Sequence, residues 1–178
     1  MDSYFPITYL SLLLFLLSIV GWFVIRQVFK TRKIEKNLSQ LQQKVSQQKA
    51  SAQEYYELGS IYLDKKLFSQ ATVQFQKALK CKDLVEEENK ALVHNALGYA
   101  YVGLEQYDVA IRQYKEALKF YPDYAIAWNN LGFAYEKKKL TAQAIEAYEE
   151  ALKFDPNNST AKQRVKSLSK RIATPANN

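Results

Sequence analysis

The chain is poor in the residues that build reactive and cross-linked sites. Its 178 residues include one cysteine, Cys81, and one histidine, His94. A single cysteine excludes an internal disulfide and any multi-cysteine metal site. We expect the single histidine to be a packing residue rather than a catalytic one. The sequence also has no glycine-rich phosphate loop and no zinc-ligand spacing. We therefore predict a protein that is not an enzyme and that has no catalytic residues, metal or cofactor.

The chain also lacks a basic central region, although its net charge is +7. Residues 26–50 carry seven basic side chains and one acidic one, and residues 159–178 carry five basic ones. Residues 51–158 carry thirteen basic and sixteen acidic side chains. Binding of DNA or RNA requires a basic face, so we predict no nucleic-acid partner. Because signatures of an enzyme are absent, we also predict no small-molecule substrate.

What the chain does have is a repeated stretch. Residues 91–124 and 125–158 align without a gap and agree at fifteen of thirty-four positions, and residues 52–85 carry the same skeleton. In each copy, apolar and small residues recur at i, i+3, i+4 and i+7, which places them on one face of a helix. Pro122 and Pro156 follow the second helix of their copies and stop it.

Small residues within each copy indicate close packing of two helices. We expect Gly98 and Gly132 to let two helix backbones approach each other. Ala110 and Ala144 should leave room on the second helix for aromatic rings of the first. A single hairpin does not bury its apolar face, so the copies are expected to stack.

These residues resemble the tetratricopeptide repeat, a thirty-four-residue helical hairpin with the pattern W-x2-L-G-x2-Y, then A-x3-F, then P. The third copy departs from the pattern only by Tyr148 in place of Phe. The second copy has His94 where the repeat usually has Trp or another large ring, which is why we expect it to be a packing residue, and the first has Asp83 in place of Pro. The resemblance implies an all-α, right-handed solenoid of about three hairpins with a C-terminal capping helix, preceded by one transmembrane helix.

That transmembrane helix is predicted from an uncharged run, Ile7–Ile25, in which thirteen of nineteen residues are Leu, Ile, Val or Phe. As a helix the run is about 28 Å long, close to the roughly 30 Å thickness of the hydrocarbon layer. Trp22 near one end, and Tyr4 and Tyr9 near the other, are placed as interfacial aromatic residues. We assign residues 1–25 to an N-terminal anchor in membrane lipid.

A cleaved signal peptide is the alternative interpretation of this run. Signal peptides begin with basic residues and end in small ones, whereas here Asp2 precedes the run and bulky, basic residues follow it.

By the positive-inside rule, the basic residues that follow the run lie in the cytoplasm, or in the stroma of a plastid. They are Arg26, Lys30, Arg32, Lys33 and Lys36.

The remaining chain divides into three parts. Residues 26–50 contain no glycine or proline and are expected to form a basic helical stalk, which either docks on the first repeat or dimerises. Residues 51–158 contain the repeats, as copies 52–85, 91–124 and 125–158. Residues 159–178 are predicted to be a basic capping helix and tail, with contact to a membrane surface as the alternative.

The first two copies are thirty-nine rather than thirty-four residues apart. The additional residues fall within 82–90, where we expect a longer turn. Glu86, Glu87 and Glu88 in this turn should favour the start of the next helix through the helix dipole. An acidic docking point is the alternative role of these residues.

In stacked repeats of this family the first helix of each hairpin lines a concave groove, and the resemblance implies which side chains project into it. They are Tyr56, Ser60, Leu63, Asn95, Tyr99, Val102, Asn129, Phe133 and Glu136. The amides of Asn95 and Asn129 can donate to and accept from a peptide backbone. Packing between repeats is the alternative role of the three aromatic rings.

One family function is not expected. Members that hold the C-terminal carboxylate of chaperones have Lys and Asn at the positions of Tyr56 and Ser60. This chain therefore lacks the first residues of a chaperone-tail clamp.

The order of anchor, stalk and repeats looks like the small thylakoid proteins of cyanobacteria and plastids that assist photosystem I assembly or stability. The resemblance implies a protein-binding scaffold at the stromal or cytoplasmic face of the thylakoid membrane. Its partners would be photosystem I subunits or assembly intermediates. The alternatives are a membrane-anchored receptor or co-chaperone for protein import or insertion, and a self-assembling structural module.

Overall fold

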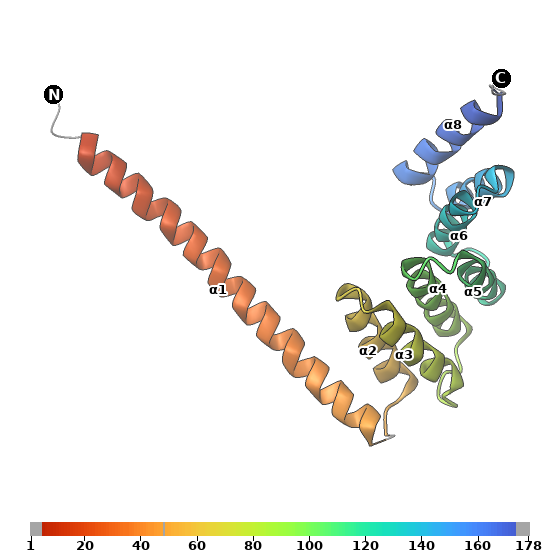
Figure 1. Cartoon of the computed structure of the whole chain (residues 1–178), viewed down its shortest axis with the longest axis horizontal. Coiled ribbons are helices and arrows are strands. Elements are labelled where there is room, and N and C mark those ends of the chain that lie inside the picture. The colour runs from red at the N-terminus through yellow and green to blue at the C-terminus, as the bar shows by residue number, and fades with distance from the viewer. Residues whose placement is uncertain (1–4, 48, 174–178) are drawn as a thin grey trace. The chain divides into compact units, whose positions relative to one another are not determined.

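The computed structural model describes residues 5–47 and 49–173, and in that part of the chain all regular structure is helical. The predicted all-α class is confirmed. The chain divides into two compact units, Met1–Lys44 and Val45–Asn178. The helices, labelled in Figure 1, are α1 (Phe5–Ser46), α2 (Ala52–Asp64), α3 (Phe68–Lys80), α4 (Glu87–Gly103), α5 (Tyr107–Phe120), α6 (Ala125–Lys137), α7 (Thr141–Phe154) and α8 (Ser159–Ala173).

The helix α1 has 42 residues and contains one candidate membrane span, Thr8–Phe29. This stretch has a mean hydropathy of 2.3, and none of its apolar window is buried within the protein. A bilayer with a hydrocarbon thickness of about 30 Å would cover these side chains. The predicted run Ile7–Ile25 lies within α1. Residues 1–4 of the predicted anchor lie outside the described residues.

Hydroxyl groups inside the candidate span bond to the helix that carries them. Ser11 Oγ donates to the Thr8 carbonyl at 2.9 Å, and Ser18 Oγ donates to the Leu14 carbonyl at 2.8 Å. An unsatisfied polar group is costly in hydrocarbon, and these local bonds satisfy both donors. The two serines therefore fit within a bilayer without a partner helix.

The predicted interfacial Trp22 lies seven residues before Phe29, the last residue of the candidate span. Its ring is edge-on to that of Phe23, with centroids 5.2 Å apart, and the guanidinium carbon of Arg26 lies 5.5 Å from the Trp22 centroid. This cation–π contact holds the first basic residue beside the indole ring. At the other end Tyr9 is exposed, and Tyr4 lies outside the described residues.

The same helix continues into the predicted stalk. It ends at Ser46, and residues 49–51 are not helical. At 1.5 Å per residue, residues 30–46 add about 25 Å to the helix beyond the candidate span. The described residues omit Gln48 and the side chains of Lys30, Lys33 and Ile34. Docking and dimerisation of the stalk both stay predictions.

The second unit stacks three helical hairpins and a final helix. Helix α2 packs with α3, α4 with α5, and α6 with α7, while the second helix of each hairpin packs against the first helix of the next. The pairs follow one another along this unit, and α8 lies after α7 (Figure 1). Contacts are strongest between consecutive helices, and α2–α4 and α4–α6 touch more weakly. This arrangement is the predicted solenoid of hairpins.

In every hairpin a glycine of the first helix lies under an aromatic ring of the second. A Cβ atom at Gly98 would lie 2.6 Å from the Tyr114 ring, and one at Gly132 would lie 2.9 Å from the Tyr148 ring. The corresponding pair in the first hairpin is Gly59 and Phe75. The three rings are almost completely buried. These glycines therefore make room for an aromatic ring of the second helix.

The turn within each hairpin contains a residue with left-handed backbone geometry. Lys66, Glu105 and Lys139 have φ angles of 58°, 59° and 60°. In the first hairpin the Leu67 N–H donates to the Tyr62 carbonyl at 2.8 Å, and the other two turns repeat this bond. It is the six-to-one bond of the Schellman motif that ends a helix. The bond offsets part of the cost of a non-glycine residue in this geometry, which is about 1 kcal/mol.

The longer connection between the first two hairpins is part turn and part helix. Helix α4 begins about one turn before Ala91, with Glu87 and Glu88 in its first turn. The predicted place of these acidic residues at the start of the helix is confirmed. In the same connection, the Asp83 carboxylate accepts hydrogen bonds from the Ala52 N–H at 3.0 and 3.3 Å. Asp83 therefore caps the start of α2.

The last helix closes the stack. Asn158 Oδ1 accepts a hydrogen bond from the Ala161 N–H at 3.0 Å, which caps the start of α8. Ala161 and Leu168 are buried, and Val165 packs against the same apolar core. The predicted capping helix is confirmed, and residues 174–178 of the predicted tail lie outside the described residues.

Candidate peptide-binding groove

The nine residues predicted to line the groove lie on α2, α4 and α6, three on each helix. Within a helix they are spaced four and three residues apart, which places them on one face. Tyr99 is 52% exposed, and the other eight are half-buried. All nine side chains are therefore at least partly accessible. We call this face the candidate groove.

A chain of hydrogen bonds joins the second and third repeats. Asn95 Nδ2 donates to the Tyr124 hydroxyl at 3.3 Å, and Asn130 Nδ2 donates to Asn95 Oδ1 at 3.0 Å. Tyr121 stacks on Tyr124, with ring centroids 5.5 Å apart. Burial, and then the neighbouring Tyr56, raise the pKa of Tyr124. Both ends of the Asn95 amide are thus occupied by other side chains, although we expected this amide to bind a peptide backbone.

Asn129 differs from Asn95 because its acceptor is unused. Its Oδ1 atom is buried and accepts no hydrogen bond from the described residues. A buried acceptor without a donor destabilises a protein by about 1–3 kcal/mol. Rotation of this amide toward the candidate groove would let it accept a hydrogen bond from a ligand.

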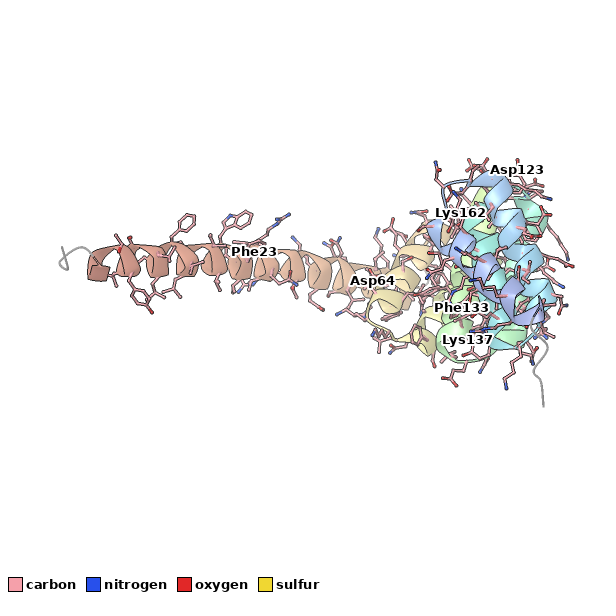
Figure 2. The ribbon with its side chains drawn as sticks, turned by 90° about the horizontal axis from the view of Figure 1, so that it is seen from above. Phe23, Asp64, Asp123, Phe133, Lys137 and Lys162 are labelled. Atoms are coloured by element: carbon pink, nitrogen blue, oxygen red, sulfur yellow. The ribbon has the colours of Figure 1, made fainter. Side chains whose placement is uncertain are left out.

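The three predicted aromatic residues differ in how firmly they are packed. Tyr56 leans against the buried Phe75, with ring centroids 5.7 Å apart and planes inclined by 49°. The Lys137 ammonium lies 5.3 Å from the Phe133 centroid, and both residues are labelled in Figure 2. Tyr99 is the ring with the most exposed surface. The Tyr56 ring is thus held by packing against Phe75, while the Tyr99 ring is the one most available to a partner.

Two hollows lie between the first and second hairpins. One brings Ser60 and Leu63 of α2 together with Tyr99 of α4. The other places Tyr56 beside Leu92. Predicted residues of both repeats therefore face shared spaces. Val102, by contrast, packs partly against the core.

The charged member of the predicted set, Glu136, is already engaged. Its carboxylate accepts a hydrogen bond from the Tyr148 hydroxyl at 3.3 Å and lies 3.4 Å from the Arg164 guanidinium of α8. Burial first, and then the negative charge of Glu136, raise the pKa of Tyr148. The remaining predicted residues carry no charge. The candidate groove is thus an apolar and amide surface whose one charge is compensated from within.

Two further side chains belong to the candidate groove and were missed from the sequence. Leu92 and Ile126 are 38% and 58% exposed. They lie three residues before Asn95 and Asn129, and therefore on the same helix face. Extending the i, i+3, i+4 pattern one step toward the helix start would have found both. They make the groove more apolar than predicted.

The single histidine and the single cysteine both lie where packing, rather than chemistry, explains them. His94 stacks on Phe120, with planes inclined by 15°, and its Nδ1 atom lies 2.9 Å from Gln113 Oε1. Burial, and then the charge of Asp83, raise the pKa of Cys81, which disfavours the reactive thiolate. Within residues 5–47 and 49–173 no three His, Cys, Asp or Glu side chains are placed to hold a metal ion.

Comparison with known proteins identifies the repeats and several relatives. Two tetratricopeptide-repeat models match residues 95–159 and 52–82. A protein named ycf37 from Cyanophora paradoxa is 38% identical over 130 residues, which are 71% of this chain and 73% of that protein. The ycf37 protein of Guillardia theta is 34% identical over 126 residues, or 71% of each chain. The chloroplastic tetratricopeptide repeat domain-containing protein PYG7 of Arabidopsis thaliana is 42% identical over 122 residues, which are 68% of this chain and 40% of that protein.

Solved structures share the same arrangement of hairpins. The crystal structure of MamA matches with a TM-score of 0.73 and 20% identity, over 81% of each chain. The first repeat domain of Spaghetti (RPAP3), bound to an HSP90 peptide, matches with a TM-score of 0.64 and 21% identity, over 70% of this chain and 94% of that one. At these identities the likeness concerns the fold alone. The fold and the relatives together show that the chain belongs to the tetratricopeptide-repeat proteins and, within them, to the family of proteins named ycf37.

Proposed function

We propose that this protein is a non-catalytic, membrane-tethered scaffold whose candidate groove holds an uncharged, partly apolar segment of another polypeptide. The observation that carries the proposal is the composition of the groove. Exposed Tyr99, Leu92 and Ile126 offer apolar contact area, while the one charged residue, Glu136, is paired with Arg164. An apolar surface with a few amides suits a peptide better than it suits a charged ligand.

Asn129 supplies the polar element of this recognition. Its unused buried acceptor gains a partner if the side chain rotates to accept a backbone N–H of the bound segment. Asn95 instead keeps Tyr124 and the neighbouring hairpin in place through its two hydrogen bonds. The two asparagines, predicted as equivalent, therefore have different roles in the proposal.

We propose photosystem I subunits or assembly intermediates as the clients, at the stromal or cytoplasmic face of the thylakoid membrane. Support comes from the family, which includes ycf37 proteins, and from the Arabidopsis relative, whose name states that it is chloroplastic. The candidate span at the N-terminus supports a membrane location. The basic residues after the span support the orientation of the repeats.

Affinity capture from detergent-solubilised thylakoid membranes tests the client. We expect the tagged full chain to retain photosystem I subunits. Tyr99→Ala should lower their recovery at least about fivefold, because truncating an aromatic anchor costs more than 1 kcal/mol of binding. Phe154→Ala removes an exposed ring outside the predicted groove and serves as the matched control. Recovery of translocon components instead would favour an import or insertion receptor, and recovery of the protein alone would favour self-assembly.

Deletion of the gene tests the physiological role. We expect the amount of photosystem I to fall while that of photosystem II stays unchanged. An unaltered ratio of the two photosystems would contradict the proposed client, even if the groove binds peptides.

A further inference from the structure

The final helix, α8, carries charge of one sign only. Its five charged residues are all basic and all exposed, and the helix has no acidic residue. They are Lys162, Arg164, Lys166, Lys170 and Arg171. The repeats that precede α8 are acidic overall. The excess of positive over negative charge in the second unit therefore lies at the end of the stack.

Three of these residues form a stripe along the helix. Lys162, Lys166 and Lys170 follow one another at intervals of four residues, so they lie on neighbouring turns of one side. Like charges at this spacing destabilise an isolated helix. An anionic surface outside the helix would remove that repulsion.

Exposed lysines near the ends of α5 and α7 are neutralised within their own helices. Lys119 lies 2.6 Å from Glu116, and Lys153 lies 2.5 Å from Glu150. In α8, Arg164 pairs with Glu136 of α6. For Lys162 and Lys166 the described residues provide no acidic partner. Lys162 and Lys166 therefore leave their charge to the surroundings, unlike Lys119 and Lys153.

The shape of this surface favours a broad, flat partner. The apolar side of α8 is buried against α7 through Ala161 and Leu168, which leaves the outer side of a single helix facing solvent. Lys162 on this outer helix is labelled in Figure 2. Near the end of α8, Ile172 is 55% exposed, and basic residues combined with an apolar one are typical of helices that lie on bilayer surfaces.

We propose that the stripe of Lys162, Lys166 and Lys170 on α8 binds the anionic headgroups of a lipid bilayer. A bilayer spanned by the candidate helix in α1 would supply such headgroups to the second unit, which is tethered to it by the chain. Basic residues near anionic lipid attract it over about a Debye length. The three lysines are not among the residues of the candidate groove, which lie on α2, α4 and α6, so the proposed lipid contact does not depend on which polypeptide the groove binds.

A fluorophore on α8 of the full chain tests this proposal. Cys81→Ser removes the native thiol, and Ser169→Cys provides an exposed attachment point for NBD, a dye that brightens in an apolar environment. The labelled chain is assembled in nanodiscs of phosphatidylcholine, or of phosphatidylcholine and phosphatidylglycerol in equal parts. We expect at least about twofold brighter emission with the anionic lipid, reversed by concentrated salt, which shortens the Debye length to about 3 Å.

Two sets of substitutions assign the effect to α8. Replacing Lys162, Lys166 and Lys170 with Gln should abolish the response to anionic lipid, and replacing them with Arg should preserve it. The matched control replaces Lys137, Lys138 and Lys139 with Gln, which removes the same charge from the α6–α7 turn and should leave the response intact. Thermal melts followed by circular dichroism check that each variant is folded.

Three results would overturn the proposal. The first is equal emission in both kinds of nanodisc. The second is an equal loss of response in both sets of Gln variants, which would indicate attraction by net charge alone. The third is a larger response to polyglutamate added to phosphatidylcholine nanodiscs than to phosphatidylglycerol, which would make α8 a site for acidic polypeptides. Lipid dependence and salt reversal in the chain with native lysines test the proposal even if a Gln variant is unstable.

Discussion

In each hairpin, a glycine of the first helix contacts an aromatic ring of the second, and this contact sets how closely the two helices pack. Small residues at these positions were predicted from the repeat pattern, but the atoms they admit were not. The i, i+4 spacing places Gly98 on the packing face, whereas the position of the Tyr114 ring depends on the angle between α4 and α5. That angle results from all the side chains of the interface together, so the pattern of a single helix does not contain it.

Gly98→Ala should destabilise the second unit by about 1–3 kcal/mol, the usual effect of overpacking a core. The new methyl group would lie 2.6 Å from the Tyr114 ring, and Tyr114, only 1% exposed, has no room to move. The midpoint of urea unfolding in detergent measures the loss. Gly21→Ala is the matched control because nothing lies within 4 Å of its added carbon, and an equal midpoint for both variants would contradict the account.

Stability should fall at alkaline pH because of Tyr114. Burial first, and then Tyr99, raise the pKa of Tyr114 above its usual value of about 10. The folded state therefore holds this proton more tightly than the unfolded state does. Its contribution to stability is complete below about pH 10 and is lost as pH rises further.

Between pH 9 and 11 we expect this one group to lower the free energy of unfolding by about 1.4 kcal/mol. Tyr114→Phe removes the ionisable hydroxyl and should make the pH dependence shallower by that amount, whatever its effect at neutral pH. Urea titrations at both pH values measure the difference. Parallel pH profiles for the two proteins would show that Tyr114 is not responsible.

Among the elements, the connection between α3 and α4 also caps another helix, which the sequence did not predict. The sequence predicts a longer turn here and acidic residues at the start of the next helix, and both features are present. The bond from Asp83 back to Ala52 spans 31 positions in the sequence. Asp83 stands where the repeat pattern has proline, and its carboxylate caps the first helix of the preceding hairpin.

Asp83→Ala should lower stability by about 1 kcal/mol, the usual loss when a helix cap is removed. Hydrogen exchange of amides in the first turn of α2 should speed up more than exchange in α6. Asp83→Asn keeps one acceptor and should have a smaller effect, while Lys82→Ala, a change at an exposed neighbour, should have none. Unchanged exchange in Asp83→Ala would mean that Ser51, the N-cap of α2, is sufficient to cap the helix.

The turns within the hairpins show a second limit of sequence reading at this scale. Glycine usually marks a left-handed position, yet here the chain places Lys66, Glu105 and Lys139 there. Helix ends were therefore readable from the change in apolar pattern but not from a turn residue. The left-handed residue in each turn accompanies the six-to-one hydrogen bond that ends the preceding helix.

For the whole molecule, the order of an apolar helix followed by stacked hairpins was readable from the sequence, because both signals are periodic and long. For the candidate groove, the sequence predicted which face of each helix is involved but not the contacts that its side chains make. Asn95 bonds Tyr124, which lies 29 positions away, and such a contact depends on the tilt between hairpins. The repeat pattern therefore treats Asn95 and Asn129 alike, although the structure gives them different neighbours. Binding of a polypeptide by the nine residues stays a prediction.

The orientation of the molecule in the membrane can be tested directly. The positive-inside rule predicts that the repeats face the cytoplasm or stroma, with the residues before the candidate span on the other side of the bilayer. Protease added to that side of intact vesicles should remove a C-terminal tag and leave an N-terminal tag protected. Protection of the C-terminal tag would contradict the predicted orientation and, with it, the proposed access to newly made photosystem subunits.

The nearest-neighbour pattern of contacts among the hairpins makes the second unit resemble an elastic rod. Since contacts in this unit are made mainly between neighbouring helices, small rotations at successive interfaces would add up and change the curvature of the stack. Opening or tightening the inner curve then requires only gentle bending. A bound polypeptide of greater or smaller thickness would then be accommodated by a change in curvature, without unfolding of a helix.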